Sequence, residues 1–185
     1  MKPSASAILI PADNNEGVIA LVEHAFRSRG FRSHPTPIPP GYPLRRDEWF
    51  DFGVGVQPGN KVVLILPSDV EAVFRVAVVL SATLGDIPLV AMRRYMGMAP
   101  VMKLFIKGRP RWRDGEDADH ESKYEVPTVR PSEFDAPEDH GLPASAKEME
   151  SLLGDNLRRY EAARQDPSSA LSWHPFLSRK SKLNV

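Results

Sequence analysis

The chain contains no cysteine. This absence excludes disulfide bridges, a thiol nucleophile and zinc sites with cysteine ligands at once. The five histidines do not compensate, because they are scattered and no two have the spacing of metal ligands on one helix. We therefore expect neither a bound metal ion nor a cofactor.

Net charge and long apolar runs are lacking as well. Lys plus Arg and Asp plus Glu both number 24, so a general attraction to nucleic acid or to anionic membrane is not expected. The longest uncharged run of the aliphatic region, 76–85, is roughly half a membrane span. Asp13 interrupts the apolar stretch near the N-terminus before it reaches the length of a signal-peptide core. These features predict a soluble, cytoplasmic protein without a membrane partner.

Familiar catalytic and phosphate-binding motifs are also missing. The chain has no G-x-S-x-G, no Walker phosphate loop, no G-x-G-x-x-G and no H-E-x-x-H. The stretch GVGVQPGN (53–60) holds three glycines but leads into a strand, whereas a phosphate cradle precedes a helix. These absences favour a non-enzymatic protein without excluding an enzyme.

Two stretches of the chain repeat one pattern. ILIPADNNEGVIALVEHAF (8–26) and LILPSDVEAVFRVAVVL (64–80) each contain three aliphatic residues, Pro, a small residue, Asp and a run with helical periodicity. They predict strands at about 5–10 and 61–66, followed by helices at about 14–29 and 69–84. One plan written twice indicates two half-units of a single fold.

Further strands complete the plan. Alternation in EWFDFGVGV (48–56) predicts a strand, and QPGN (57–60) joins it to the strand at 61–66 as a hairpin. IPLVAMRRY (87–95) and VMKLFIKG (101–108) flank a GMAP turn and predict a second hairpin. The order predicts an α+β, ferredoxin-like (βαββαβ) antiparallel sheet with an added C-terminal hairpin strand. A flavodoxin-like parallel sheet is the rival, and the QPGN hairpin counts against it.

The composition changes beyond residue 113. Residues 114–143 contain ten acids and two bases, which predicts an extended, weakly structured segment. The next segment, 145–164, predicts an amphipathic helix with a capping box at Ser145 and Glu148. Its apolar stripe comprises Met149, Leu152, Leu153, Leu157 and Tyr160, and a tail with the aromatic anchors Trp173 and Phe176 follows. We therefore divide the chain into a ferredoxin-like core (1–113), an extended acidic arm (114–144) and a helix with its tail (145–185).

The central strands are apolar on both faces. Residues 7–10 and 62–66 do not alternate with polar residues, and exposing one face would forgo roughly 1.5–3 kcal/mol for each large side chain. The second face must therefore be covered, by the C-terminal helix and tail, by a second copy or by another protein. The helix at 69–84 shows a similar excess, because Val76, Val78 and Val79 widen its apolar arc.

This surplus of apolar surface favours a non-enzymatic protein-interaction or assembly protein. A structural subunit and an inhibitor or immunity-type binder both fit, and the partner is another protein or a second copy. The methionines around the GMAP turn are typical of adaptable contact surfaces. The predicted partner-binding residues are Val78, Val79, Met96, Met98, Trp173 and Phe176.

A nucleic-acid-binding protein is the first alternative. The hairpin 87–113 holds seven bases and no acid, with aromatic residues interleaved, a composition suited to phosphate contacts and base stacking. An acidic run follows at once, and the central strand KVVLIL lacks the aromatics that RNA-binding versions of the fold use. The candidate residues are Arg93, Arg94, Lys103, Lys107 and Arg109.

A small enzyme is the second alternative. Trp49 and Asp51 lie beside glycines at 53 and 55, so a ligand could approach the backbone there. A charge that protects an edge strand from aggregation is the favoured interpretation of Asp51. Asp13 and Asp69 occupy equivalent strand-to-helix junctions and fit helix N-caps better than a shared carboxylate site.

Overall fold

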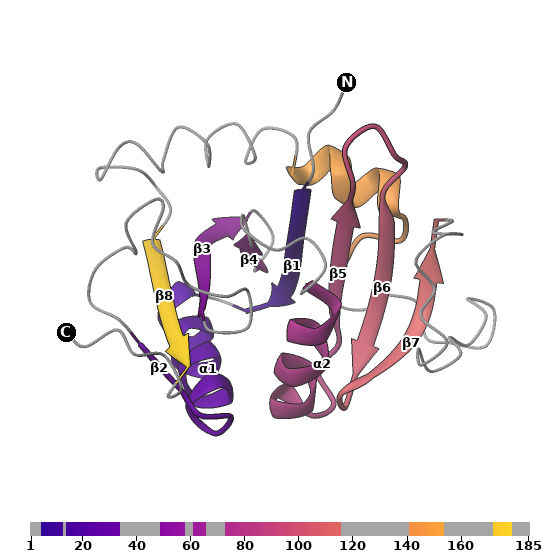
Figure 1. Cartoon of the computed structure of the whole chain (residues 1–185). Helices are drawn as coiled ribbons and strands as arrows, with labels where there is room; N and C mark the ends of the chain where they lie inside the picture. Colours follow the sequence, from indigo (N-terminus) through magenta and orange to yellow (C-terminus); the bar gives the residue numbers. More distant parts are fainter. Residues whose placement is uncertain are drawn as a thin grey trace.

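The computed structural model describes seven parts of the chain, which together form an α+β structure (Figure 1). Within three of these parts, and at Trp112, only the backbone is described. The described residues are 5–12, 14–33, 49–57, 61–65, 73–115, 141–153 and 172–178, with backbone alone at 49–57, 61–65 and 172–178.

Eight strands and three helices are present in these parts. The first half-unit contains β1 (Ala5–Pro11), α1 (Asn15–Arg27) and the short β2 (Phe31–Ser33), followed by β3 (Trp49–Gln57). The second contains β4 (Lys61–Ile65), α2 (Val73–Leu84), β5 (Leu89–Arg94), β6 (Val101–Ile106) and β7 (Arg109–Asp114). A helix at 146–153, which we call the cover helix, and β8 (Ser172–Ser178) complete the set.

The described strands form one sheet in the order β2-β8-β3-β4-β1-β5-β6-β7. Every pairing in it is antiparallel, which confirms the predicted sheet type and excludes the parallel rival. β1 lies at the centre, where Ile8 is opposite Leu64 of β4 and Ala91 of β5. The strands of the two repeated stretches are thus direct neighbours.

The N-cap of helix α1 lies one residue later than predicted. Asn14 is the N-cap, and its side-chain oxygen accepts a hydrogen bond from Gly17 N–H at 2.8 Å. The assignment of this role to Asp13 is therefore wrong, since an asparagine oxygen one position later reaches a free N–H of the first turn. Asp13 and Asp69 themselves lie outside the described residues.

The first hydrophobic core lies between the sheet and helices α1 and α2. Figure 1 shows both helices on one side of the sheet. Alternate residues of β1 and β5, such as Ile8 and Leu89, belong to this core together with Leu80 of α2. The wide apolar arc of α2 packs against this core, because Val76 is buried in it and Val78 and Val79 are partly buried against it.

The second core lies on the opposite face of β1, β5 and β6. It contains the other alternate residues of these strands, and the chain's own segment 142–153 packs against them. For residues 7–10 the prediction that this face is covered is confirmed, and the described cover comes from the chain itself. For residues 62–66 it stays a prediction, because their side chains lie outside the described part. The buried residues of this core are Ala7, Leu9, Val90, Met92, Met102, Leu104, Leu142, Ala146, Met149 and Leu153.

Three strands were missed by the sequence prediction. β2 has only three residues, and β7 follows β6 after a two-residue turn at Lys107 and Gly108, both with positive φ. β8 occupies part of what was predicted as a tail, and it pairs with β2 and β3. The sequence of β8, SWHPFLS, carries a proline inside the run, which counts against a strand in a prediction from sequence.

The β6–β7 turn packs tightly on the C-terminal end of α2. The buried hydroxyl of Ser81 accepts a hydrogen bond from Gly108 N–H at 2.9 Å, and Gly85 O accepts one from Lys107 N–H at 3.1 Å. A Cβ at Gly108 would lie 3.0 Å from the Ala82 Cβ. Glycine is therefore required at position 108 for both conformation and space.

We expect Gly108→Ala to lower the free energy of unfolding by more than the roughly 1–2 kcal/mol that a left-handed alanine costs. Gly85→Ala is the matched control, because Gly85 also has positive φ but a Cβ there would meet nothing within 4 Å. Urea unfolding of both variants measures the difference. Equal losses would contradict the tight contact with Ala82.

Candidate interaction surface

The cover helix is positioned by its own capping residues. Glu148 N–H donates to the Ser145 hydroxyl at 3.1 Å, and the Glu148 carboxylate accepts from Ala144 N–H at 2.9 Å. The predicted capping box is present with one difference. Glu148 accepts from the N–H of Ala144, the residue before the N-cap, whereas in the standard motif it accepts from the N–H of the N-cap itself. The helix therefore begins at a site that its local sequence specifies.

Two polar contacts join the cover helix to the sheet. The Asp114 carboxylate at the end of β7 accepts a hydrogen bond from Ala146 N–H at 2.6 Å. Arg94 at the end of β5 forms an ion pair with Glu150, and both side chains are largely buried. A carboxylate at a helix N-terminus is favourable because the first N–H groups have no partner within the helix. The helix is thus held at two points on different strands.

Sequence reasoning did not identify Asp114 or Glu150 as functional or structural contacts. Asp114 is 32 positions from Ala146, and Arg94 is 56 positions from Glu150. Asp114 was only the first member of an acidic run in the sequence. No local signal distinguishes it from its acidic neighbours.

The predicted apolar stripe of the cover helix is partly wrong. Met149 and Leu153 are buried against the sheet as expected, but Leu152 is 43% exposed. Leu142 and Ala146 take the remaining places in the core. Leu157 and Tyr160 lie outside the described residues. The buried spacing of 142, 146, 149 and 153 is that of one helix-like face, and Leu152 points away from it.

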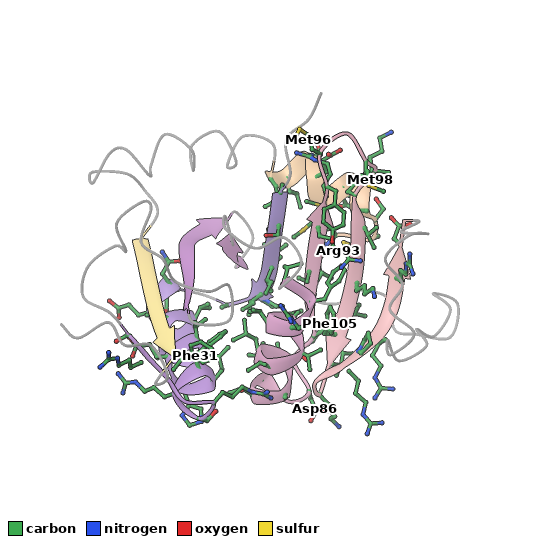
Figure 2. The ribbon with its side chains drawn as sticks, in the orientation of Figure 1. Phe31, Asp86, Arg93, Met96, Met98 and Phe105 are labelled. Carbon is green, nitrogen blue, oxygen red and sulfur yellow. The ribbon has the colours of Figure 1, made fainter. Side chains whose placement is uncertain are left out.

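The turn between β5 and β6 carries exposed methionines. Met96 is 60% exposed and Met98 is 40% exposed, and the turn is closed by a hydrogen bond from Met98 N–H to Tyr95 O at 3.0 Å. Figure 2 shows both methionines at one end of the molecule, with Asp86 at the other. The cover helix crosses the sheet at the methionine end (Figure 1). We call Met96 and Met98 the methionine-end surface.

The other predicted partner-binding residues belong to other elements of the fold. Val78 and Val79 pack partly buried beside the first core. Trp173 and Phe176 lie on β8, where Trp173 is opposite Gly53 and Phe176 is opposite Phe50. Only the backbone of β8 is described, so the placement of the two aromatic rings lies outside the described part. A partner role for these four residues stays a prediction.

The edges of the sheet are poor templates for pairing with another strand. One edge is β2, which has three residues. The other is β7, with the sequence RPRWRD, in which a proline and three arginines discourage strand addition. Contact with another protein through an added strand is therefore disfavoured at both edges.

The five basic residues predicted to bind nucleic acid do not lie on one surface of the protein. Arg93 and Lys103 are buried on the face that carries α2, and Arg94 is buried on the opposite face beside Glu150. Lys107 and Arg109 lie at the far turn, where the Lys107 Nζ is 2.7 Å from an Asp86 carboxylate oxygen. Contacts with the phosphates of a nucleic-acid strand require exposed basic side chains on one side of the protein.

Arg93 and Lys103 converge on one aromatic ring. The Arg93 Cζ is 4.6 Å and the Lys103 Nζ is 4.8 Å from the centroid of Phe74, and the Arg93 Cζ is also 5.5 Å from the Tyr95 ring. A ring face attracts cations, and the attraction strengthens when water is excluded. These two bases therefore contribute to the interior beside the start of α2.

The alternative site around Trp49 and Asp51 lies on β3. Asp51 is opposite Pro175 of β8, and Gly53 is opposite Ile65 of β4. β3 is an interior strand, so the interpretation of Asp51 as an edge-strand charge is wrong. Side chains of this strand lie outside the described part, and a pocket there stays a prediction.

Within the described ranges, no group of three or more histidine, aspartate or glutamate side chains is arranged to hold a metal ion. No helix in those ranges combines the length and the apolar composition needed to cross a membrane. No protein-family model, curated protein or solved structure matches the chain.

We expect Met149→Ala to lower the free energy of unfolding by about 2–5 kcal/mol, because it leaves a cavity in the second core. Leu152→Ala on the same helix is the control and should change it by no more than about 0.5 kcal/mol, since Leu152 is largely exposed. Urea unfolding followed by circular dichroism measures both. A Met149 variant as stable as the Leu152 variant would show that the cover helix does not pack as described.

Proposed function

We propose that the protein is a non-enzymatic interaction or assembly protein that contacts another protein through the methionine-end surface. The observation that carries the proposal is the exposure of Met96 and Met98 at a turn beside the cover helix. Methionine side chains adapt to different partners and are common at contact surfaces. An inhibitor or immunity-type binder and a subunit of a larger assembly both fit this proposal.

The proposal includes a ferredoxin-like core for the first 113 residues. Its support is the strand order β3-β4-β1-β5, with α1 after β1 and α2 after β4 on the same face of the sheet. This order is that of two interlocked βαβ half-units. The fold by itself implies no activity, since the same architecture serves many functions.

The distribution of exposed apolar side chains supports a contact at this end. Among the described residues, four large hydrophobic side chains are exposed. Met96 and Met98 form the methionine-end surface, and Leu152 lies on the cover helix. The fourth, Ile87, follows Asp86 at the opposite end (Figure 2). Because both edges of the described sheet disfavour strand addition, the apolar surface at this end is the one that a partner is best able to bury.

No observation on the five candidate basic residues supports the alternative that the protein binds nucleic acid. Three of these five basic residues are buried. The remaining two lie at the β6–β7 turn, at the end of β6 opposite to the methionine-end surface. The cytoplasmic location also stays a prediction.

We expect the double variant Met96→Lys and Met98→Lys to weaken partner binding by about tenfold or more, because each buried methionine contributes roughly 1.5–3 kcal/mol. Affinity capture from the source cells with quantitative mass spectrometry measures proteins retained by each bait. Sedimentation velocity over a range of concentrations measures self-association in the same samples.

Ile87→Lys is the matched control, because it places the same charge on an exposed apolar residue at the opposite end. Proteins retained equally by the wild type and by Ile87→Lys, but lost from the double variant, are expected. The proposal is overturned if the double variant retains the same proteins as the wild type and if no bait self-associates.

A further inference from the structure

The methionines in the described part of the chain fall into two groups. Met92, Met102 and Met149 are completely buried in the second core, where Met92 of β5 lies opposite Met102 of β6. Met96 and Met98 lie in the turn between the same two strands and are 60% and 40% exposed (Figure 2). One hairpin therefore holds protected methionines in its strands and accessible methionines in its turn.

Peroxide oxidises a methionine thioether to a sulfoxide, and accessibility decides which methionines react. The sulfur attacks one peroxide oxygen, the O–O bond breaks and an S–O bond forms. The transferred oxygen gives its proton to the departing hydroxide, which leaves as water, so the sulfur loses two electrons and the peroxide gains them. The chain has no cysteine, so none of its own thiols competes with the exposed thioethers for the oxidant.

We propose that Met96 and Met98 form a paired oxidation site, at which hydrogen peroxide converts the methionine-end surface from apolar to polar and releases its protein partner. This inference rests on the proposed function, to which it adds regulation. A sulfoxide oxygen is a hydrogen-bond acceptor, and burying it against an apolar partner without a donor is unfavourable. Oxidation places this cost on both residues of the surface.

The fold tolerates this change because neither exposed sulfur belongs to a hydrophobic core. Both cores are formed by other residues, and the buried methionines lie in the second of them. The turn is closed by its backbone, with Met98 N–H donating to Tyr95 O at 3.0 Å, and this bond does not involve a side chain. Oxidation at the turn therefore alters the surface without unfolding the protein. A sulfoxide there also stays accessible to the reductases that restore methionine.

Limited oxidation of the wild-type protein is the first test. Hydrogen peroxide adds one oxygen, about 16 Da, to each methionine that reacts, and peptide mass spectrometry locates it. Met96 and Met98 should react at least about tenfold faster than Met92, Met102 and Met149, whose sulfurs become accessible only when the structure opens. The urea midpoint of the protein oxidised at both turn positions should equal that of the untreated protein. Equal rates at all five positions, or a lowered midpoint, overturn the inference.

Two double variants separate methionine oxidation from other effects of peroxide. Met96→Leu with Met98→Leu keeps the surface apolar but has no sulfur to oxidise, so its capture of partner proteins should survive peroxide treatment. Met96→Gln with Met98→Gln imitates the polar sulfoxide, so it should weaken partner binding by about tenfold or more without peroxide.

Affinity capture with quantitative mass spectrometry measures both variants, with each bait oxidised and freed of peroxide before the capture. The wild-type bait should lose after oxidation the same proteins that the lysine double variant loses. It should regain them after treatment with methionine sulfoxide reductases, one for each sulfoxide epimer.

The outcomes distinguish this inference from the proposed function. If the oxidised wild type keeps the proteins that the lysine variant loses, the oxidation switch is wrong and the proposed interaction function stands. If the leucine variant loses these proteins after peroxide treatment, the effect does not arise at Met96 and Met98, and the inference is overturned. If the lysine variant loses no protein and no bait self-associates, the proposed function fails and the switch fails with it.

Discussion

Three neighbouring strands, β1, β5 and β6, carry apolar side chains on both faces, and the described structure depends on burying both. One face is covered by α1 and α2, and the other by the cover helix. Each large side chain left in water would forgo roughly 1.5–3 kcal/mol, so neither face can stay open. The position of the cover helix therefore follows from the composition of strands that precede it by 40 residues or more.

The polar contacts of the cover helix act on top of this apolar requirement. Burial of Met149 and Leu153 brings the helix to the sheet without fixing its direction, because hydrophobic contact is not directional. The bond from Ala146 N–H to Asp114 and the ion pair of Glu150 with Arg94 hold the helix at two points on different strands. A hydrogen bond and a buried ion pair have defined partners, so they select one orientation.

The same constraint accounts for the limited surface left for a partner. Both faces of β1, β5 and β6 are covered, and the edges of the described sheet are short or carry proline and arginine. The basic side chains of the second hairpin are divided between two faces and a turn. What remains in the described part is an apolar surface at the end where β5 turns into β6, and this surface leads to the proposed function.

The sequence by itself determined the local elements: the repeated strand and helix stretches, the two hairpins, the antiparallel pairing and the capping box at Ser145. These depend on side-chain periodicity and turn residues within a few positions of one another. The tertiary structure alone decided which residues cover the second face, that Asn14 caps α1, and that β7 and β8 extend the sheet. Contacts such as Asp114 with Ala146 join residues 32 positions apart, and several occupants could have satisfied the same apolar face equally well. Local periodicity states that a face must be buried; only the path of the folded chain decides what buries it.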